Sequence, residues 1–346
     1  MQWEPLDLRA LDDAGVAAWD ALHATIDLEA MPDVELPPTA YRYRQGITRA
    51  PEESVTRFGV WSSDRSVLLG EAVVTTRDVE DNRHLAYVDL VVAPSARRRG
   101  LARAALPLVC DVAAADGRTK LWLDSYADQP GVAFLEAIGA TKVMVGRSSR
   151  VFTKDLDRSM LEGWVAKAAE RAVGYDLVFW ATPTPEEHID RFVDILHVMN
   201  SAPMGDADWE PEIFTPDMVR GWDVRRLATG TSKLTLVARH LDSGVFAGLS
   251  EIVLEVEGRP SFGHQDNTGT DPAHRDKGLG RWMKAVMALR ILDEHPEVEF
   301  LDTWNNDANR PMLNINEAMG FAPWLYDGEY QIEVDAARAA AVPQIQ

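Results

Sequence analysis

One turn occurs twice in this chain at a fixed distance. The first copy is Pro94-Ser95-Ala96-Arg97-Arg98-Arg99-Gly100-Leu101-Ala102, and the second is Pro272-Ala273-His274-Arg275-Asp276-Lys277-Gly278-Leu279-Gly280. Both read Pro-x-x-Arg-x-x-Gly-x-small, and corresponding residues lie 178 positions apart (272 − 94). This distance is far above the period of a solenoid repeat, so it predicts the duplication of a whole domain.

The length of 346 residues also favours two domains. We expect a first domain over residues 1–155, a helical connector over 156–172 and a second domain over 173–346. In both halves strands alternate with helices, and the turn lies between an apolar strand and an amphipathic helix. This order predicts a mixed-sheet α/β fold that binds its ligand at the carboxyl end of a central strand.

The expected elements follow the same order in the two halves. In the first half we expect helices over 12–24, 99–115 and 132–138, and strands over 58–61, 67–75, 86–92, 120–123 and 142–153. In the second half we expect helices over 184–199, 279–293 and 311–319, and strands over 175–180, 234–239, 245–256, 262–268, 300–304 and 324–334. The run 155–172 looks helical and carries no site chemistry, so we interpret it as the connector.

The composition narrows the classes of partner. The formal charge of −20 opposes binding to nucleic acid or to an anionic membrane, and it favours a cationic substrate or serves solubility alone. The single cysteine, Cys110, cannot form an internal disulfide and is interpreted as a buried core thiol. The eight histidines form no ligand-spaced cluster, so no metal is expected. The sequence has no apolar run of membrane length and no signal-like start, and we expect a cytoplasmic protein.

The start of a helix rich in small residues presents free backbone N–H groups and the positive end of the helix dipole, and both suit a phosphate group. The turn lacks the Lys-Ser/Thr pair of a Walker A loop and the glycine spacing of the dinucleotide-binding fingerprint.

Arg97-x-x-Gly100-x-Ala102 and Arg275-x-x-Gly278-x-Gly280 resemble the acyl-CoA pyrophosphate motif of the GNAT superfamily of acyltransferases. In the second half, the stretch from Asn305 to Met312 and then Asn316-Glu317-Ala318-Met319-Gly320-Phe321 is similar to the family segment that ends in Gly-Phe. The first half has a diverged counterpart at residues 134–140. The resemblance covers nearly the whole chain and implies two tandem GNAT domains whose central strands splay apart around acetyl-CoA or another short acyl-CoA.

The resemblance also implies which residues contact the cofactor. In the second half these are Thr268, Gly269, Thr270, Arg275, Asp276, Lys277, Gly278, Leu279, Gly280, Arg281, Asn305, Asn309 and Met312. In the first half they are Val91, Val92, Arg97, Arg98, Arg99, Gly100, Leu101 and Ala102. A backbone N–H at a bulge in the strand before the turn is expected to stabilise the thioester oxyanion.

Acetylation of an amine needs a group that takes a proton from the incoming ammonium. In the family this base is often a Glu eleven residues ahead of the motif, a position that holds His264 in the second half and Ala86 in the first. His264 is either this base or a polar residue satisfied near a strand end, and a water relay through Asp266 is the fallback.

The family's usual acid is a Tyr four residues before the Gly of Gly-Phe, where this chain has Asn316 and, in the first half, Leu135. Three alternatives therefore stay open for the leaving thiolate. Water protonates it, Asn316 contacts the sulfur end of the cofactor, or Tyr326 or Tyr330 reaches in.

We expect a GNAT-type N-acetyltransferase whose second domain moves an acetyl group to a primary amine of a small molecule, while the first domain is a diverged copy that either binds CoA or only completes the fold. Acidic loops over 204–212 and around Asp27 to Glu35, beside Trp209 and Trp222, suit a cationic acceptor or are simply solvated. The alternatives are a non-catalytic acyl-CoA sensor or scaffold, a mycothiol-synthase-like enzyme and a protein N-acetyltransferase.

Overall fold

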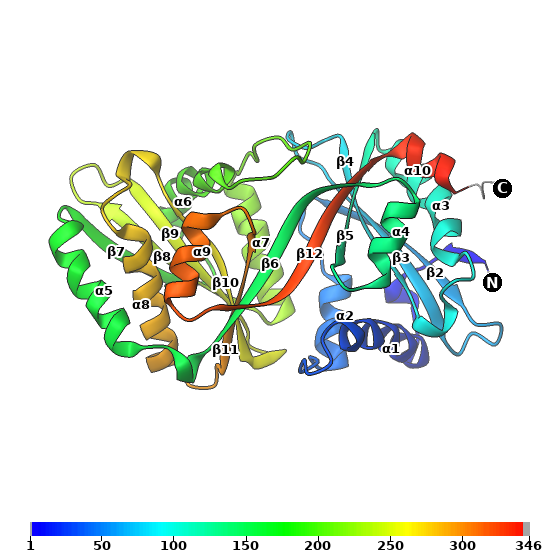
Figure 1. The fold of residues 1–346 in the computed structure, drawn as a ribbon, viewed down its shortest axis with the longest axis horizontal. Coiled ribbons are helices and arrows are strands. Elements are labelled where there is room, and N and C mark those ends of the chain that lie inside the picture. The colour runs from blue at the N-terminus through cyan, green and yellow to red at the C-terminus, as the bar shows by residue number, and fades with distance from the viewer. Residues whose placement is uncertain (1, 342–346) are drawn as a thin grey trace. The chain divides into compact units, whose positions relative to one another are not determined.

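The computed structural model describes residues 2–341 of the chain and divides them into two compact units. Within the described range, unit 1 comprises residues 2–145, 205–210 and 326–341, and unit 2 comprises residues 146–204 and 211–325. The strands and helices expected from the sequence occur in the expected order (Figure 1). Four further elements were not predicted: the strand Trp3–Pro5 and the helices Thr39–Ile47, Pro216–Thr229 and Val334–Ala340.

The elements of unit 1 come mainly from the first half of the chain. Its strands are β1 (Trp3–Pro5), β2 (Glu53–Trp61), β3 (Leu68–Arg77), β4 (Leu85–Val92) and β5 (Lys120–Tyr126). Its helices are α1 (Asp13–Ala30), α2 (Thr39–Ile47), α3 (Leu101–Ala115), α4 (Pro130–Ala137) and α10 (Val334–Ala340), with 3-10 turns η1 (Leu8–Ala10) and η2 (Pro94–Ala96).

The elements of unit 2 come mainly from the second half. Its strands are β7 (Tyr175–Ala181), β8 (Ser232–His240), β9 (Phe246–Glu255), β10 (Arg259–Thr270) and β11 (Phe300–Asn306). Its helices are α5 (Arg158–Arg171), α6 (Ile189–Leu196), α7 (Pro216–Thr229), α8 (Leu279–Glu294) and α9 (Arg310–Ala318), with 3-10 turns η3 (Thr153–Asp155), η4 (Glu186–His188), η5 (His197–Ser201) and η6 (Pro272–His274).

The two units have the same strand order. In unit 1 it is β1-β2-β3-β4-β5-β12, where β12 is Ala322–Glu333, and in unit 2 it is β7-β8-β9-β10-β11-β6, where β6 is Thr141–Phe152. In each sheet one central pair is parallel, β4 with β5 and β10 with β11, and the other pairs along the two orders are antiparallel. The predicted mixed-sheet α/β class is confirmed.

The last strand of each sheet comes from the other half of the chain. Residues 146–152 of β6 pair with β11 of unit 2, and residues 327–333 of β12 pair with β5 of unit 1. The units therefore do not follow the expected contiguous ranges 1–155 and 173–346. In Figure 1 the chain can be followed along β12 into the sheet of the N-terminal elements.

The expected connector is a structural part of unit 2. Helix α5 begins at the Asp157 cap, whose carboxylate accepts from Met160 N–H at 3.0 Å, and packs along α8. Leu161 is fully buried in the core that α8 shares with the sheet. The run 156–172 therefore contributes hydrophobic surface as well as a link.

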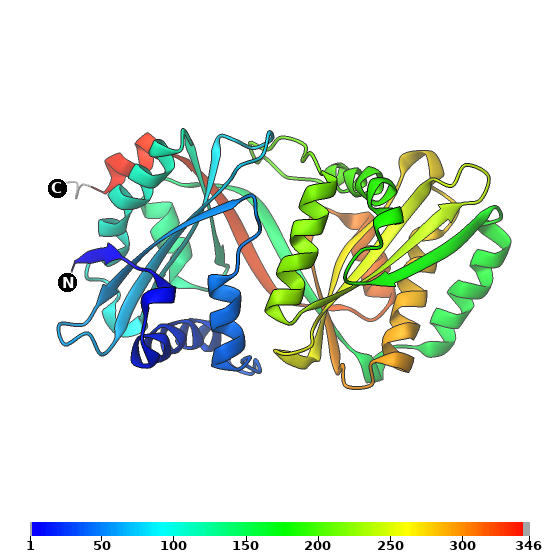
Figure 2. The same cartoon turned by 180° about the vertical axis from the view of Figure 1, so that it is seen from behind.

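Unit 2 has a hydrophobic core on each face of its sheet, because successive residues of a strand point to opposite sides. Leu234 and Leu236 of β8 belong to the core with α5 and α8, whereas Val237 belongs to the core with α6 and α7. In unit 1 the same alternation points the side chain of Ala72 of β3 toward the hydrophobic core. The side chain of its neighbour Glu71 points to the other face of the sheet and contacts α1. Figure 2 shows α1 and α2 beside the strands β2 and β3.

Candidate functional site

Both turns have the same backbone conformation. Arg98 and Asp276 have φ values of 61° and 64°, and Gly100 and Gly278 have φ values of 78° and 79°. Consecutive N–H groups in a turn that combines right- and left-handed residues point to one side and form a concavity that binds anions. The repeat in the sequence is therefore also a repeat in three dimensions.

The N–H groups of both turns are free. Gly100 and Gly278 cap α3 and α8 without a side-chain hydrogen bond, and the first bonds back to these caps come from Ala104 and Trp282. Within residues 2–341, the backbone N–H groups of 98–103 and 276–281 have no acceptor. Free N–H groups at the positive end of a helix dipole form a phosphate-binding site.

Open space lies next to the two glycines. A Cβ added at Gly100 or Gly278 would meet no protein atom within 4 Å, and one at Gly280 would lie 3.8 Å from Thr270 Oγ1. Protein packing therefore does not require glycine at 100 and 278. The positive φ requires it, and the open side leaves the backbone accessible to a ligand.

The parallel central strands separate beside each turn. In unit 1, β4 pairs with β5 only over Leu85–Tyr87, although β4 continues to Val92. In unit 2, β10 pairs with β11 only over Phe262–His264, although β10 continues to Thr270. Each sheet therefore opens over the stretch that leads into its turn, as the prediction of splayed strands requires.

Only β10 carries a bulge in this stretch. Its residue Gln265 is paired with Ile252 and its residue Thr268 with Ser250, so three steps along β10 match two steps along β9. A bulge leaves one residue out of the ladder and turns its N–H away from the neighbouring strand. In unit 1 the register of β4 on β3 is continuous from Tyr87 to Val92.

Comparisons with known proteins agree with this geometry. Residues 20–140, which include the first turn, match the model of the acetyltransferase (GNAT) family. A tandem GNAT protein from the clavulanic acid biosynthesis pathway, solved without acetyl-CoA, is 24% identical over 99% of both chains with a TM-score of 0.77. Residues 20–140 thus match the acetyltransferase (GNAT) family, and the whole chain has the fold of a tandem GNAT protein.

Two further solved structures share the fold at lower identity. A GCN5-related N-acetyltransferase from Sphaerobacter thermophilus is 12% identical with a TM-score of 0.59, and the match covers 96% of this chain and 95% of that one. An N-myristoyltransferase from Saccharomyces cerevisiae, solved with myristoyl-CoA and inhibitors, is 11% identical with a TM-score of 0.57, over 96% of this chain and 79% of that one. No curated protein matches the chain. The prediction of a GNAT-type acetyltransferase is confirmed.

The cofactor-binding residues implied by the GNAT motif fall on three parts of each unit. Val91, Val92, Thr268, Gly269 and Thr270 end the central strands. Arg97, Arg98, Arg99, Gly100, Arg275, Asp276, Lys277 and Gly278 form the turns. Leu101, Ala102, Leu279, Gly280 and Arg281 begin the helices. The side chains of Leu101 and Leu279 are buried in the cores, so only their N–H groups are free for a ligand.

The first arginine of the motif is bound differently in the two units. Arg97 forms a two-pronged ion pair with Glu29 at the end of α1, with Nη1–Oε1 at 2.6 Å and Nη2–Oε2 at 2.5 Å, and its Nε donates to Val92 O. The hydrogen bonds from Arg97 hold the pKa of Glu29 below its usual value. Arg275 has no such carboxylate and is exposed, with Nε donating to Thr270 O at 3.5 Å.

His264, the expected base, and Asp266, the fallback, both lie on β10. His264 is the last residue of β10 that pairs with β11, opposite Asp302, and it is half-buried. Asp266 follows at the bulge, where burial and the nearby Glu251 carboxylate raise its pKa, while His264 acts in the opposite direction. The structure brings this pair together at the start of the gap between the strands.

A buried ion pair lies beside Asp266. Glu251 of β9 is inaccessible to solvent and binds Lys233 Nζ at 2.6 Å, Thr235 Oγ1 at 3.0 Å and Asn267 Nδ2 at 2.8 Å. Burial alone would raise the pKa of Glu251, but the Lys233 ammonium holds it below its usual value. Sequence reasoning missed this pair, since nothing in the local pattern shows that Lys233 and Glu251 face each other.

Asn316 occupies the position of the family tyrosine. It is fully buried in α9, its Nδ2 donates to Asn305 Oδ1 at 2.8 Å, and its Oδ1 has no hydrogen-bond partner among the described residues. Asn309, expected to bind the cofactor, instead caps α9 by accepting a hydrogen bond from Met312 N–H at 3.4 Å. Asn305 and Asn316 thus form a hydrogen-bonded pair of side-chain amides, in which Asn316 Oδ1 receives no hydrogen bond from the described residues.

Two features assigned to the second half belong to unit 1. Tyr326, considered as an acid for the second domain, lies on β12, and its carbonyl accepts from Ala127 N–H. Residues 205–210, the centre of the acidic loop, also belong to unit 1: Asp208 binds Lys120 Nζ at 2.6 Å, and the ring of Trp209 lies 5.6 Å from that of Trp122. The reason is the exchange of chain between the units, which the sequence pattern does not reveal.

Unit 1 has its own buried ion network. Glu71 of β3 is inaccessible to solvent and binds Arg57 Nη1 at 2.8 Å, His23 Nε2 at 2.6 Å and Trp19 Nε1 at 3.2 Å. Burial opposes the charged form of Glu71, but His23 and Arg57 keep its pKa below the usual value. Asp89 of β4 lies near this network.

Carboxylates line the neighbouring strands of the same sheet. Asp124 of β5 is paired directly with Glu329 of β12, and Trp122 Nε1 donates to Glu329 Oε2 at 2.5 Å. Burial and the neighbouring acids Asp89 and Asp327 raise the pKa of Asp124 to about 6. Burial and the neighbouring acids likewise raise the pKa of Glu329 to about 7.

In the described part of the chain, no group of three or more His, Cys, Asp or Glu side chains is arranged to hold a metal ion. No helix within residues 2–341 combines the length and the apolar character needed to span a membrane. Cys110 is buried in unit 1, and burial raises the pKa of its thiol to about 11, as suits a core residue.

Proposed function

We propose that unit 2 transfers an acetyl group, or another short acyl group, from acyl-CoA to a primary amine of a small molecule. The observation that carries this proposal is the bulge of β10 between Gln265 and Thr268. It lies between the opening of the strands at His264 and the phosphate-binding turn. A free N–H at this place suits the oxyanion that develops when an amine attacks a thioester.

The residues of unit 2 fit acyl-CoA. The free N–H groups of residues 276–281 suit the pyrophosphate, with open space beside Gly278. The orphan Oδ1 of Asn316 suits an N–H donor, and the pantetheine arm supplies amide N–H groups. A buried acceptor without a partner is costly in the free protein, so a ligand that supplies the donor accounts for it.

In this proposal the bulge N–H donates to the thioester oxygen while the amine attacks the carbonyl carbon. Asp266 and His264 take the proton that the amine loses, directly or through water. Glu251, held ionised by Lys233, adds negative charge beside Asp266 and thereby strengthens its proton affinity. The thiolate leaves with a proton from solvent, since the family tyrosine is replaced by Asn316.

The acceptor class follows from charge. The chain carries a formal charge of −20, and an amine is protonated before it reacts. A protonated primary amine is therefore drawn to the protein and must lose its proton at the site, which is the role given to Asp266 and His264. A cytoplasmic location, in which acetyl-CoA is available, is part of the same proposal.

A non-catalytic acyl-CoA sensor is the second candidate function. The observation that favours it is Asn316, because this residue cannot protonate a leaving thiolate. Release of CoA during incubation with acetyl-CoA and amines separates the two candidates. Steady turnover supports the enzyme, and binding without turnover supports the sensor.

The test of the site is a calorimetric titration of the full-length chain with acetyl-CoA. Gly278→Glu places a carboxylate where the pyrophosphate is expected, and Gly244→Glu is its matched control. Gly244 has a φ of 71°, against 79° for Gly278, and is equally open apart from Arg191 at 4.0 Å. Both variants carry the same strain, so we expect Gly278→Glu alone to lose the site of unit 2. Retained binding at that site in Gly278→Glu contradicts the proposal.

A further inference from the structure

Lys284 of α8 is a buried cation for which the described part of the chain supplies no counter-ion. The residue is 1% exposed, and its side chain forms neither a hydrogen bond nor an ion pair with any residue in 2–341. Its Nζ atom lies 5.8 Å from the centre of the Phe321 ring. Burial of an unpaired charge opposes folding, so the stability of the fold does not explain a lysine at this position.

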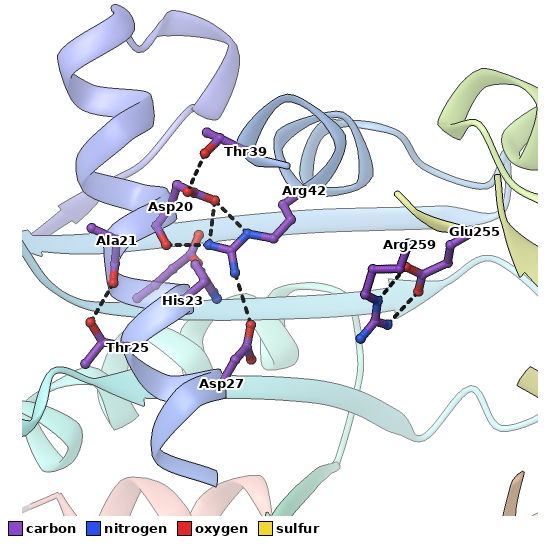
Figure 3. Close-up of polar contacts among 10 residues, drawn as sticks. Asp20, Ala21, His23, Thr25, Asp27, Thr39, Arg42, Glu255 and Arg259 are labelled. Carbon is purple, nitrogen blue, oxygen red and sulfur yellow. Dashed lines mark hydrogen bonds and ion pairs between the residues drawn. The ribbon is translucent and has the colours of Figure 1, made fainter. Parts of the chain in front are cut away.

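The partly buried cations Arg42 and Arg259 show what Lys284 lacks. Arg42 Nε donates to Asp20 Oδ1 at 2.7 Å, and Arg259 Nε donates to Glu255 Oε2 at 2.9 Å (Figure 3). A second nitrogen of Arg42 donates to the carboxylate of Asp27, and a second nitrogen of Arg259 donates to the other oxygen of Glu255. Such carboxylates compensate the burial of a guanidinium group, and Lys284 has none among the described residues.

Unit 1 shows that this position can be filled by an apolar side chain. The interval of 178 positions between the two turns relates Lys284 to Leu106 of α3, which is also 1% exposed and belongs to the hydrophobic core of its unit (284 − 106). Asn316, whose Oδ1 has no partner among the described residues, likewise corresponds to the buried Leu135. Leucine serves packing at both positions in unit 1, so the two polar groups of unit 2 point to a ligand.

Lys284 and Asn316 lie in the same hydrophobic core and have a common neighbour. Phe321, whose ring Lys284 approaches, donates its N–H to the Asn316 carbonyl oxygen at 3.0 Å. Phe321 and Ile315 of α9 pack in the core that α8 shares with the sheet. Lys284 therefore lies beside the helix that carries the acidic tyrosine in the family, at a place where this chain has an amide.

The helix also directs the Lys284 side chain toward the proposed cofactor site. Long side chains on an α-helix lean toward its N-terminus and cover the turn four residues before them. For Lys284 this turn contains Gly280, which has no side chain to block the approach, and a Cβ there would meet only Thr270 Oγ1, at 3.8 Å. The ammonium group therefore leans toward the end of α8 at which the free N–H groups lie.

The proposed base and Lys284 lie on opposite faces of the sheet of unit 2. Asp266 is beside the buried pair of Lys233 and Glu251, and Lys233 Nζ lies 5.0 Å from the ring of Phe192, in the core with α6 and α7. Lys284 lies in the core on the other face, with α5 and α8. The strands β10 and β11 separate between these two faces. A proton acceptor thus stands on one side of the gap and a proton donor on the other.

We infer that Lys284 is the catalytic residue that delivers a proton to the sulfur of the departing CoA. The inference rests on the acyl transfer proposed for unit 2, where this proton comes from solvent, and it names the group through which the proton arrives. When the carbon–sulfur bond breaks, its electron pair stays on sulfur. The Lys284 ammonium gives a proton to this sulfur, an S–H bond forms, and the neutral amine regains a proton from solvent before the next turnover.

The acidity of Lys284 suits this role. Burial lowers the pKa of its ammonium group to about 7. An ordinary lysine, with a pKa above 10, holds its proton too tightly to give it up readily near neutral pH. A group whose pKa lies near the working pH can both give up and regain a proton in each turnover.

The first experiment compares the full-length wild type with Lys284→Met and with the control Lys167→Met. Lys167 lies exposed on α5 of the same unit, so its variant makes the same substitution away from the core. Methionine resembles the apolar stem of lysine, and unit 1 has Leu106 at this position, so Lys284→Met is expected to fold. With a primary amine that the wild type acetylates, Lys284→Met should lower kcat at least tenfold and leave the Kd for acetyl-CoA within twofold. Lys167→Met should change neither value.

The second experiment needs no turnover. Each protein is saturated with CoA, and the ionisation of the bound thiol is followed through the ultraviolet absorbance of the thiolate as pH is raised. The signal of unit 2 is the part that is absent from Gly278→Glu. A cation that faces the sulfur favours the thiolate, so this thiol should ionise at least one pH unit lower in the wild type and in Lys167→Met than in Lys284→Met.

The inference and the proposed function fail in different ways. Turnover that Lys284→Met leaves unchanged overturns the inference alone, and so does a thiol that ionises at the same pH in Lys284→Met and in the wild type. A lower kcat together with a shifted thiol ionisation supports the inference. A wild type that binds acetyl-CoA but acetylates no amine overturns the proposed function and the inference with it.

Discussion

Replacing Asn316 by leucine is expected to change stability and ligand binding in opposite directions. The Oδ1 of Asn316 is buried without a partner, and such an atom costs about 1–3 kcal/mol of folding free energy. The substitution also removes the hydrogen bond from Nδ2 to Asn305, which contributes about 1 kcal/mol. Leucine has a similar volume, and unit 1 has Leu135 at the equivalent position. The unliganded variant should therefore be more stable by about 1 kcal/mol, or about 2–4 °C in Tm for a unit of this size.

The same variant should bind acetyl-CoA more weakly. If Oδ1 accepts a hydrogen bond from the pantetheine arm, its loss costs roughly 1 kcal/mol, which corresponds to a five- to tenfold rise in Kd. Thermal unfolding without ligand and calorimetric titration measure the two effects separately. Asn314→Leu is the matched control, since Asn314 lies on the exposed face of the same helix and should change neither value. A less stable Asn316→Leu variant with an unchanged Kd would refute the reasoning.

Three further predictions concern charged groups. Burial lowers the pKa of Lys284 to about 7, so below that pH its ammonium costs the fold about 4 kcal/mol, and the cost declines as pH rises toward the unfolded pKa. Lys284→Met should therefore raise the urea midpoint at pH 7 and have little effect near pH 10; an equal gain at both values contradicts the assignment. Lys233→Met leaves Glu251 buried without its partner and should cost about 3 kcal/mol at pH 7, with a smaller loss in acid, where the carboxyl is protonated. Glu29→Gln should cost at most about 1 kcal/mol, because the pair with Arg97 is partly exposed. In the wild type, the stabilisation that Glu29 contributes to folding should be present at neutral pH and be lost as pH falls below the ordinary pKa range of a glutamate. Titration of the Glu29 carboxyl group by NMR can follow this loss.

Local sequence patterns predicted most of the elements. The strand that leads to each turn and the helix that follows it lie within three residues of the expected ranges, because apolar periodicity and the glycine cap are local signals. Helix α7 was missed although Thr215 and Pro216 form a recognisable start: the Thr215 hydroxyl accepts from Met218 N–H. The acidic residues before this helix are typical of a loop, and they favour a loop over 204–212.

The sequence predicted the part of the candidate site that consists of backbone N–H groups. The two turns depend on contiguous residues, so their spacing was enough to identify the GNAT motif. The ion pairs Glu71–Arg57 and Glu251–Lys233 join neighbouring strands, and strand register cannot be read from a single sequence. A bulge of one residue likewise changes which side chain stands at the opening of the sheet, and this is why position counting led to Ala86 rather than to Tyr87, the last residue of β4 that pairs with β5.

The exchange of the last strands ties the assembly of the two units to the order of synthesis. The edge of β5 in unit 1, which includes Leu121 and Leu123, is covered by β12, and β12 ends at Glu333. A ribosome that adds about 5–20 residues per second takes roughly 10–40 s to go from β5 to the end of β12. During that time the nascent chain presents an unpaired edge strand, a surface that invites pairing with other chains. Cutting the gene in the middle would leave the same edge open for good, so two separate halves cannot stand in for the two units.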